Sequence, residues 1–344
     1  MVLRSLGRVR ARGPRAQDGQ THRFANAPHA GRSRTIFVVH PTADLFYDPN
    51  VQHTFLKVPG NGLTLRVHRF SNETAKPSGL TVLLLHGYMD AGGTWDLLAP
   101  HLTDHGHVLL APDLRGFGES DPIGAGGYYH FLDYVADIDA LVRHLVPKNG
   151  RLAVVGHSMG GTVASLFTGS RPDRVERLAL LEGLGPPHME PSVALDRTRA
   201  WLRNLEEMQR APRRLTSMED AVRRLVANHP RVPRDVLTTR AQWLTRNDGD
   251  GLVWAYDPLH RTTSPMPFQV DVFRAFLRQI SCPTLVVGGG PFGFHPEDEM
   301  ERAHTLANVE IAELPNAGHM MHWTEPHPLG QMLARFFGGP IPST

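Results

Sequence analysis

Cysteine is almost absent from this sequence of 344 residues, since Cys282 is the only one. A single thiol excludes an intrachain disulfide and a cysteine-based zinc site. Its place before Pro283, at the start of an apolar run, predicts a buried structural thiol. The sequence also lacks any run of 18 or more apolar residues, which argues against a membrane span. A cytoplasmic protein is the simplest interpretation of these absences.

Lysine is scarce as well, with 3 residues against 33 arginines, and the positive charge is unevenly placed. Residues 1–34 hold eight arginines and one acid, Asp18, for a net charge of +7. Because the whole chain has a net charge of +2, the other 310 residues sum to −5. The basic character therefore belongs to the N-terminal segment, and no nucleic-acid partner is predicted for the body of the protein.

Residues 1–34 also lack hydrophobic periodicity, so we predict a disordered Arg-rich tail. Three origins for it stay open: an upstream start that extends the true protein, an Arg-rich transit peptide, or a basic tether. The tail has no continuous apolar stretch, which argues against a secretory signal. Organellar targeting by this segment stays open.

Beyond the tail, strand-like runs alternate with helical segments. Gly60-Asn61-Gly62 has the turn chemistry of a hairpin between its flanking strands. Strands are expected at His53–Val58, Leu63–Phe70, Leu80–Leu85, His107–Ala111, Leu152–Val155, Val175–Leu181, Pro283–Val287 and Val309–Leu314, and helices at Tyr129–Leu145 and Leu329–Phe337. This alternation predicts an α/β fold with a mostly parallel central sheet flanked by helices on both faces.

Residues 186–278 break the alternation. They show helical spacing at Val193–Gln209, Met218–Ala227 and Arg234–Leu244 and no convincing strand. We therefore predict an inserted α-helical cap at 186–278 and a core formed by residues 50–185 and 279–340.

The most informative stretch is Gly156-His157-Ser158-Met159-Gly160, which follows an apolar strand and precedes small, helix-compatible residues. A serine between two glycines at a strand-to-helix junction is typical of a nucleophile elbow. The glycines allow the strand and the helix to approach each other closely. The pattern predicts Ser158 as a catalytic nucleophile.

Two further loops follow buried strands. In the first, Gly87 allows a sharp turn, so the backbone amides of Tyr88 and Met159 are predicted to converge as an oxyanion hole. The side chain of His86 is expected to tie down this loop. In the second, the Pro112–Ser120 loop, Asp113 is expected to cap and pair within the turn rather than to take part in chemistry.

His319 lies in a glycine-bearing loop after the last strand, where a general base for Ser158 is needed. The His319-x-x-His322 spacing lacks the glutamate of a zincin motif and has no evident third ligand, so no metal is predicted. His322 is expected to pack with Trp323. The Gly288–Gly290 run lacks the features of a phosphate loop or a dinucleotide fingerprint, so no cofactor is predicted.

Together, these motifs resemble the α/β-hydrolase fold family over about Phe55 to Phe337. The histidine-glycine loop, the D-x-R-G-x-G-x-S loop, the elbow and Gly318-His319 occur in the family's order. Within the family, Leu181–Pro186 and Gly251–Pro258 resemble the serine hydrolase-like branch with a helical cap. The resemblance implies an enzyme with a Ser–His–acid triad that acts on a small-molecule substrate.

The acid departs from the family pattern, which usually places it just after the strand predicted at Pro283–Val287. No carboxylate follows that strand before Glu297. Glu182, by contrast, ends the preceding strand, and some α/β-hydrolases draw the acid from there. We predict that Glu182 orients His319, with a carboxylate in residues 297–299, Glu297 or Asp298, as the open alternative.

The sequence thus favours a serine hydrolase that cleaves a carboxylic ester or related acyl substrate through an acyl-enzyme on Ser158. One alternative is a C–C bond hydrolase of a vinylogous keto acid, with Arg203 or Arg240 as the cationic group. Another is a non-catalytic ligand-binding module on the same fold. A serine at position 158 argues against the dehalogenase and epoxide hydrolase branches, which need a carboxylate nucleophile. Nothing in the sequence selects the substrate or the oligomeric state.

Overall fold

Strands and helices alternate through the part of the chain that the computed structural model describes, residues 37–38, 48–208 and 214–338. The predicted tail at 1–34 lies outside these residues. The strands are β1 (Phe37–Val38), β2 (Val51–Pro59), β3 (Thr64–Asn72), β4 (Leu80–Leu85), β5 (Val108–Pro112), β6 (Arg151–His157), β7 (Arg177–Leu181), β8 (Thr245–Asn247), β9 (Leu252–Trp254), β10 (Thr284–Gly288) and β11 (Val309–Glu313).

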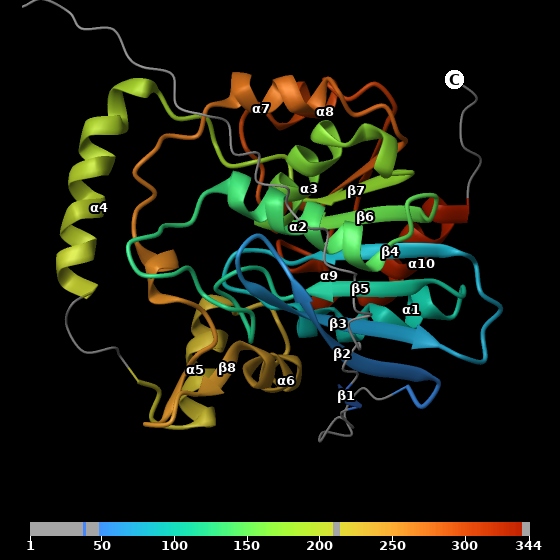
Figure 1. Ribbon diagram of the computed structural model, residues 1–344, viewed down its shortest axis with the longest axis horizontal. Helices are drawn as coiled ribbons and strands as arrows, with labels where there is room; N and C mark the ends of the chain where they lie inside the picture. Colours follow the sequence, from blue (N-terminus) through green and yellow to red (C-terminus); the bar gives the residue numbers. More distant parts are fainter. Residues whose placement is uncertain (1–36, 39–47, 209–213, 339–344) are drawn as a thin grey trace, which may run out of the picture. The chain divides into compact units, whose positions relative to one another are not determined.

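The helices connect these strands and build the insertion (Figure 1). The α-helices are α1 (Ala99–Thr103), α2 (Phe131–Leu145), α3 (Met159–Ser170), α4 (Ala194–Met208), α5 (Met218–Asn228), α6 (Arg234–Leu244), α7 (Val270–Leu277), α8 (Glu299–Ala303), α9 (Met321–Thr324) and α10 (Pro326–Gly338). The 3₁₀ helices are η1 (Gly92–Leu97), η2 (Pro172–Arg174), η3 (Pro191–Val193), η4 (Pro258–Arg261) and η5 (Gly290–Phe292). In the described ranges, no helix has both the length and the apolar character needed to cross a bilayer.

The central sheet has the strand order β1-β2-β3-β5-β4-β6-β7-β10-β11 within the described residues. The strands from β5 to β11 in this order pair in parallel. The strands β1, β2 and β3 form an antiparallel edge that joins β5. The predicted α/β fold with a mostly parallel sheet is confirmed. In such a sheet the carboxyl ends of the parallel strands meet at one edge, where ligands bind.

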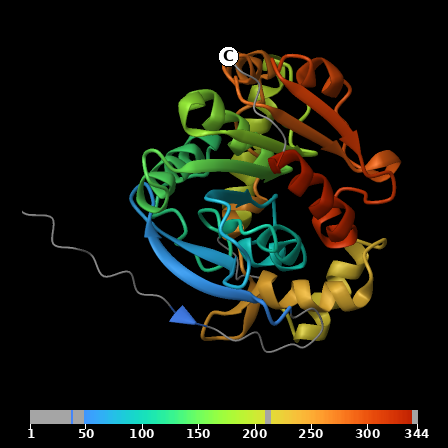
Figure 2. The same ribbon diagram turned by 90° about the vertical axis from the view of Figure 1, so that its right-hand side faces the viewer.

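Helices cover both faces of this sheet, as Figures 1 and 2 show. Successive residues of a strand point to opposite faces. In β4, Leu83 and Leu85 pack in one apolar cluster with residues of α2, α3 and α7. Val82 and Leu84 pack in a second cluster with residues of α1, α9 and α10. Because both faces are covered, the central strands are apolar along their whole length.

The insertion between β7 and β10 contains the helices α4, α5 and α6, but the expectation that it contains no strand was wrong. The short strands β8 and β9 pair antiparallel within it. The turn between them reads Asp248-Gly249-Asp250-Gly251, and Gly249 has a φ of +97°. This is a glycine-containing hairpin turn, and the sequence signal for it was present but overlooked.

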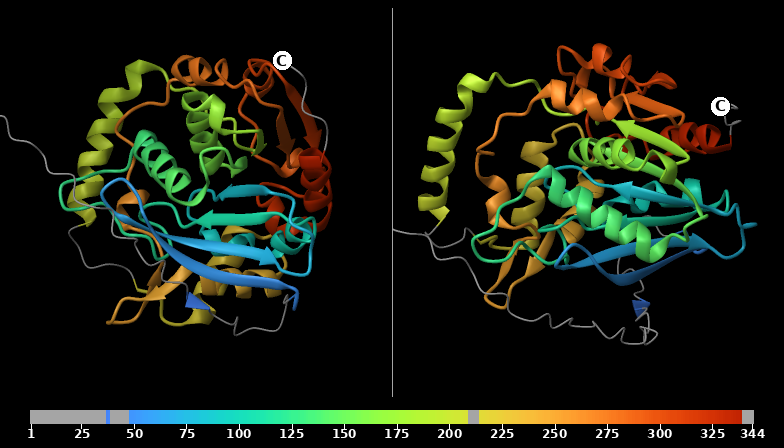
Figure 3. Two further views of the ribbon diagram at one scale, coloured as in Figure 1. Left: turned by 45° about the vertical axis from the view of Figure 1, so that its right-hand side comes forward. Right: turned by 45° about the horizontal axis from the view of Figure 1, so that its top comes forward.

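Helices α5 and α6 of the cap lie together against the core, whereas α4 stands apart from them (Figures 1 and 3). Leu225 of α5 and Leu237 of α6 share an apolar cluster with Leu97 and Trp323 of the core. No residue of α4 is buried. The cap is therefore attached to the core chiefly through α5 and α6.

Candidate active site

Ser158 occupies a sharp turn between β6, which ends at His157, and α3, which begins at Met159. Its φ of 51° and ψ of −118° are unusual for a residue with a side chain. A Cβ on Gly160 would lie 2.2 Å from the carbonyl oxygen of Leu85, and one on Gly156 would lie 2.5 Å from that of Gly160. These glycines are needed because the strand, the turn and the helix are in contact through their backbones.

His319 and Glu182 complete a hydrogen-bonded chain with Ser158. Nε2 of His319 lies 3.1 Å from Oγ of Ser158. On the other side of the ring, Nδ1 lies 2.5 Å from Oε2 of Glu182. An ionised carboxylate can only accept, so the proton sits on Nδ1, and Nε2 is left to accept from the serine hydroxyl. The structure thus brings together the three side chains that the sequence singled out as nucleophile, base and acid.

Glu182 follows β7 with a φ of 46°, and the loop after β10 surrounds its carboxylate. Oε1 accepts the backbone N–H of Gly289, and Oε2 accepts that of Phe294, both at 2.7 Å. A Cβ on Gly289 would lie 2.6 Å from Oε1, and one on Gly293 only 1.8 Å from it. The glycine-rich loop that lacks the usual acid is therefore the loop that makes room for Glu182.

The alternative acids lie elsewhere. Asp298 pairs with the buried guanidinium of Arg302, with oxygen–nitrogen distances of 2.5 and 2.9 Å. The hydrogen bond from Arg302 holds the pKa of Asp298 below its usual value. The side chain of Glu297 is exposed to solvent. Neither carboxylate is hydrogen-bonded to His319 in the described residues.

The amides of Tyr88 and Met159 belong to segments that lie against Ser158. A Cβ on Gly87 would lie 3.2 Å from Cβ of Ser158, so the loop that contains Tyr88 passes directly beside the serine. Met159 is the first residue of α3, where backbone N–H groups have no partner within the helix. Within the described residues, neither N–H donates a hydrogen bond to another group. Both amides are therefore available to a bound oxygen atom.

His86 and Asp113 hold the neighbouring loops, as expected from the sequence. His86 donates from Nδ1 to the carbonyl of Gly87 and accepts the N–H of Leu114 at Nε2. Asp113 is buried and accepts the amides of Gly92 and Glu119. Burial alone would raise the pKa of Asp113, but His68 and the amide of Glu119 lower it to about 2.

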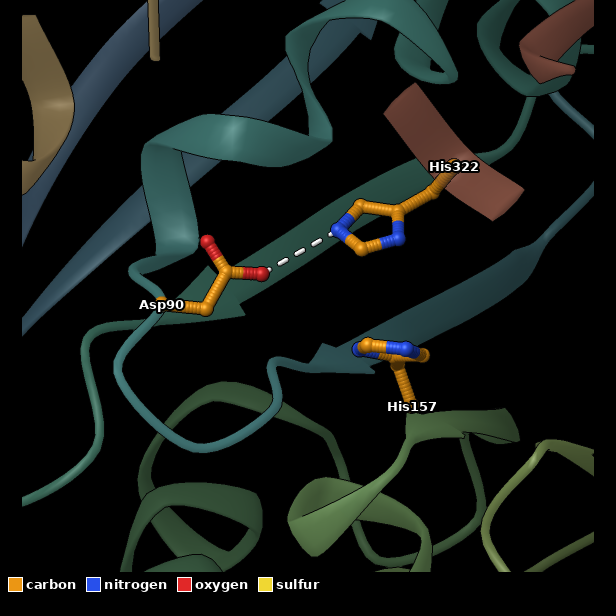
Figure 4. Close-up of side chains that lie close together, drawn as sticks. All are labelled: Asp90, His157 and His322. Atoms are coloured by element: carbon orange, nitrogen blue, oxygen red, sulfur yellow. Dashed lines mark hydrogen bonds and ion pairs between the residues drawn. The ribbon is translucent and has the colours of Figure 1, made fainter. Parts of the chain in front are cut away.

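Asp90, His157 and His322 form a buried cluster beside the site, and the sequence analysis did not foresee it (Figure 4). Nε2 of His322 lies 3.1 Å from Oδ2 of Asp90, and Nε2 of His157 lies 2.8 Å from the carbonyl oxygen of His319. His157 therefore supports the backbone of the residue that contacts Ser158. Burial lowers the pKa of both His157 and His322.

Among the described residues, this cluster also has the side-chain types and the spacing that could hold a metal ion. One ligand atom from each residue lies within 4.8 Å of the others. Nδ1 of His157 and Nδ1 of His322 have no hydrogen-bond partner, so both could act as ligands. Each ring uses Nε2 in a hydrogen bond, to Asp90 from His322 and to the carbonyl of His319 from His157, so Nδ1 is the nitrogen left for a ligand. The expected packing of His322 with Trp323 is present, with ring centroids 5.6 Å apart.

Of the two cations suggested for a substrate carboxylate, Arg240 is already engaged by other groups. Arg240 is fully buried and donates to the carboxylate of Asp96 and the carbonyl of Thr94. The expectation that Arg240 binds the substrate was wrong, because its guanidinium joins α6 of the cap to η1 of the core. Arg203 lies on the exposed surface of α4.

Two aromatic side chains near the reacting groups were missed by the sequence analysis. The ring of Phe294 lies 5.9 Å from that of His319, measured between centroids, and Phe294 is 40% exposed. Tyr88 is 49% exposed, and its hydroxyl donates to the carbonyl of His260. Phe294 therefore adds a partly exposed apolar ring beside His319. No sequence spacing links either aromatic residue to the base.

The profile of the alpha/beta hydrolase fold matches residues 81–326. A serine hydrolase-like protein of Danio rerio is 40% identical over 107 residues, which cover 31% of this chain and 32% of that protein. The match with this first curated relative therefore spans only about a third of its length.

Two further proteins match over most of their length. A 2-hydroxy-6-oxononadienedioate/2-hydroxy-6-oxononatrienedioate hydrolase of Paraburkholderia phymatum is 26% identical, and the match covers 83% of this chain and 95% of that protein. The solved structure of the thioesterase domain from the curacin biosynthetic pathway is 26% identical with a TM-score of 0.68. It covers 82% of this chain and 97% of that domain.

Proposed function

The chain belongs to the alpha/beta hydrolase family of enzymes, and from this premise we propose that it is a serine hydrolase that cleaves a carboxylic ester or related acyl substrate. The observation that carries the proposal is the hydrogen-bonded chain from Ser158 through His319 to Glu182. In this chain a histidine contacts the serine hydroxyl and a carboxylate contacts the histidine, which supports the proposed roles of nucleophile, base and acid.

The proposed reaction begins when Oγ of Ser158 attacks the acyl carbon while Nε2 of His319 takes the hydroxyl proton. Glu182 stabilises the imidazolium that forms. The amides of Tyr88 and Met159 donate to the developing oxyanion, each lowering the barrier by about 3 kcal/mol. The tetrahedral intermediate then collapses, and His319 gives its proton to the leaving group. Water, activated by the same histidine, attacks the acyl-enzyme and releases the acid.

The test uses the purified chain with p-nitrophenyl esters of increasing acyl length and with a fluorophosphonate probe. We expect ester hydrolysis and stoichiometric labelling of Ser158, with both lost in Ser158→Ala. A folded protein that hydrolyses none of the esters and is not labelled would refute the proposal and favour a ligand-binding module on this fold.

A second candidate is hydrolysis of a C–C bond in a vinylogous keto acid. It is favoured by the match to the Paraburkholderia hydrolase, which extends over 294 residues. The buried ion pair of Arg240 with Asp96 weighs against it, because one of the two suggested cations is already neutralised. Assaying ester and dienone substrates side by side separates the two candidates.

A further inference from the structure

His295 lies in the loop after β10 with an acceptor on each side of its ring. Nε2 is 2.8 Å from the carbonyl oxygen of Gly290. Nδ1 is 2.7 Å from Oε2 of Glu299, near the start of α8. A carbonyl oxygen and an ionised carboxylate can only accept hydrogen bonds, so both ring nitrogens must carry a proton to satisfy this geometry. The contacts therefore select the imidazolium form.

This ring lies next to the carboxylate that holds His319. Nε2 of His295 is 3.9 Å from Oε1 of Glu182. The Glu182 side chain is fully buried, whereas that of His295 is 38% exposed. A buried carboxylate needs compensation for lost solvation, and the amides of Gly289 and Phe294 provide part of it. A positive charge at His295 provides a further part.

The loop is shaped around both side chains. A Cβ on Gly293 would lie 2.8 Å from Nε2 of His295 and 1.8 Å from Oε1 of Glu182. The absence of a side chain at Gly293 therefore allows the imidazole and the carboxylate to approach each other.

The titratable groups that face His295 in the described residues are Glu299 from α8 and Glu182 from the end of β7. Asp298, which precedes α8, is paired with Arg302. The hydrogen bonds to Gly290 and Glu299 raise the pKa of His295 above its usual value. The electrostatic surroundings thus agree with the hydrogen-bond geometry.

We propose that His295 is a positively charged positioning residue that acts through Glu182, keeping this carboxylate ionised and aimed at His319. The inference rests on the proposed function of Ser158, His319 and Glu182. The charge at His295 opposes protonation of Glu182 and opposes a second proton on His319. Both effects extend activity toward lower pH.

The experiment compares the full chain with His295→Gln and His295→Lys. Glutamine can still donate to Gly290 but carries no charge, whereas lysine retains the charge. The first readout is the pH dependence of fluorophosphonate labelling at Ser158. We expect the acidic limb of the glutamine variant to move to higher pH by about 0.5 to 1 unit, because solvent at this partly exposed site screens the charge. The lysine variant should keep the parent profile.

The second readout is NMR and needs no turnover. In the parent, nitrogen shifts should show both ring nitrogens of His295 protonated at neutral pH. The low-field proton between His319 and Glu182 should change at a higher pH in the glutamine variant. The inference would be overturned if His295 were neutral in the parent. It would also be overturned if His295→Gln changed neither the pH dependence of the low-field proton nor the acidic limb of the labelling profile. An unlabelled parent would refute the proposed function instead, and the NMR arm would still decide the role of His295.

Discussion

Replacing Glu182 with glutamine keeps the shape of the side chain but removes its charge and one of its two accepting oxygens. The side chain is fully buried, and its two oxygens accept from Gly289, Phe294 and His319 at 2.5 to 2.7 Å. Glutamine has the same shape but only one accepting oxygen. Its NH₂ group must therefore face at least one of these three donors.

Two arrangements of the glutamine are possible, and each has a cost. With the amide oxygen at the Oε2 position, His319 keeps its tautomer but loses the anion that stabilises its imidazolium. The buried N–H of Gly289 then lacks an acceptor, which costs about 1–3 kcal/mol of folding stability. With the amide reversed, NH₂ faces His319, whose proton moves to Nε2. The ring can then no longer accept from Ser158.

We therefore expect Glu182→Gln to lower turnover at least about a hundredfold and up to about ten-thousandfold, the range typical of a neutralised triad acid. A hundredfold loss corresponds to about 2.7 kcal/mol in the activation barrier. Turnover of a p-nitrophenyl ester and the labelling rate of Ser158 measure the loss. Thermal unfolding and circular dichroism confirm that the variant is folded.

The matched control is Glu297→Gln, which neutralises an exposed carboxylate in the loop after β10 and should leave turnover nearly unchanged. Asp298→Asn should also cost far less turnover, although it weakens the pair with the buried Arg302 and should lower the melting temperature. If folded Glu182→Gln were nearly as active as the parent while a change at 297–299 was crippling, the assignment of the acid would fail.

Three further predictions concern the loop, the cap and pH. Gly293→Ala should lower activity and should lower stability by about 1–3 kcal/mol, because its Cβ would overlap Glu182. The control is Gly124→Ala, which should change neither property, because a Cβ there meets nothing within 4 Å. If both variants had the same activity and the same melting temperature, the prediction would be wrong. Substituting Trp254 or Trp201 in the cap should change acyl-chain preference more than labelling of Ser158; loss of labelling in a folded variant would count against a separate role for the cap. Burial lowers the pKa of His107 to about 4 and that of His260 to about 3. Below pH 6.5 the unfolded chain therefore binds more protons than the folded chain, and the melting temperature should fall as the pH is lowered toward 4. A melting temperature that does not change over this range would show that these rings are not buried in solution.

The fold was largely predictable because its signals are periodic and local. The run Leu80–Leu85 is apolar at nearly every position because β4 is covered on both faces. Helix α6 has the bounds Arg234–Leu244 that its spacing predicts. The pair β8–β9 was missed because three-residue strands are too short for periodicity, which leaves only the turn glycines as a signal.

The site was predictable where a backbone constraint leaves a mark on the sequence. The glycines around Ser158 mark contacts between backbones, and such contacts tolerate no side chain. Arg240 and His295 leave no comparable mark. Their roles depend on partners 144 and 113 positions away, Asp96 and Glu182, and only the folded chain brings these together.

The position of the acid follows from how the ends of two neighbouring strands pack together: a side chain from one strand fills the space that the other leaves empty. β7 and β10 are parallel and adjacent, so their carboxyl ends can each present a side chain to His319. There is room for one carboxylate, and here Glu182 fills it from β7. Gly289 and Gly293, which follow β10, must then be free of side chains, because a Cβ on either would meet Oε1 at 2.6 or 1.8 Å. The absence of an acid after β10 and the buried acid after β7 are therefore one structural feature. The glycines that stand where the family usually has its acid thus indicate that the carboxylate comes from the neighbouring strand.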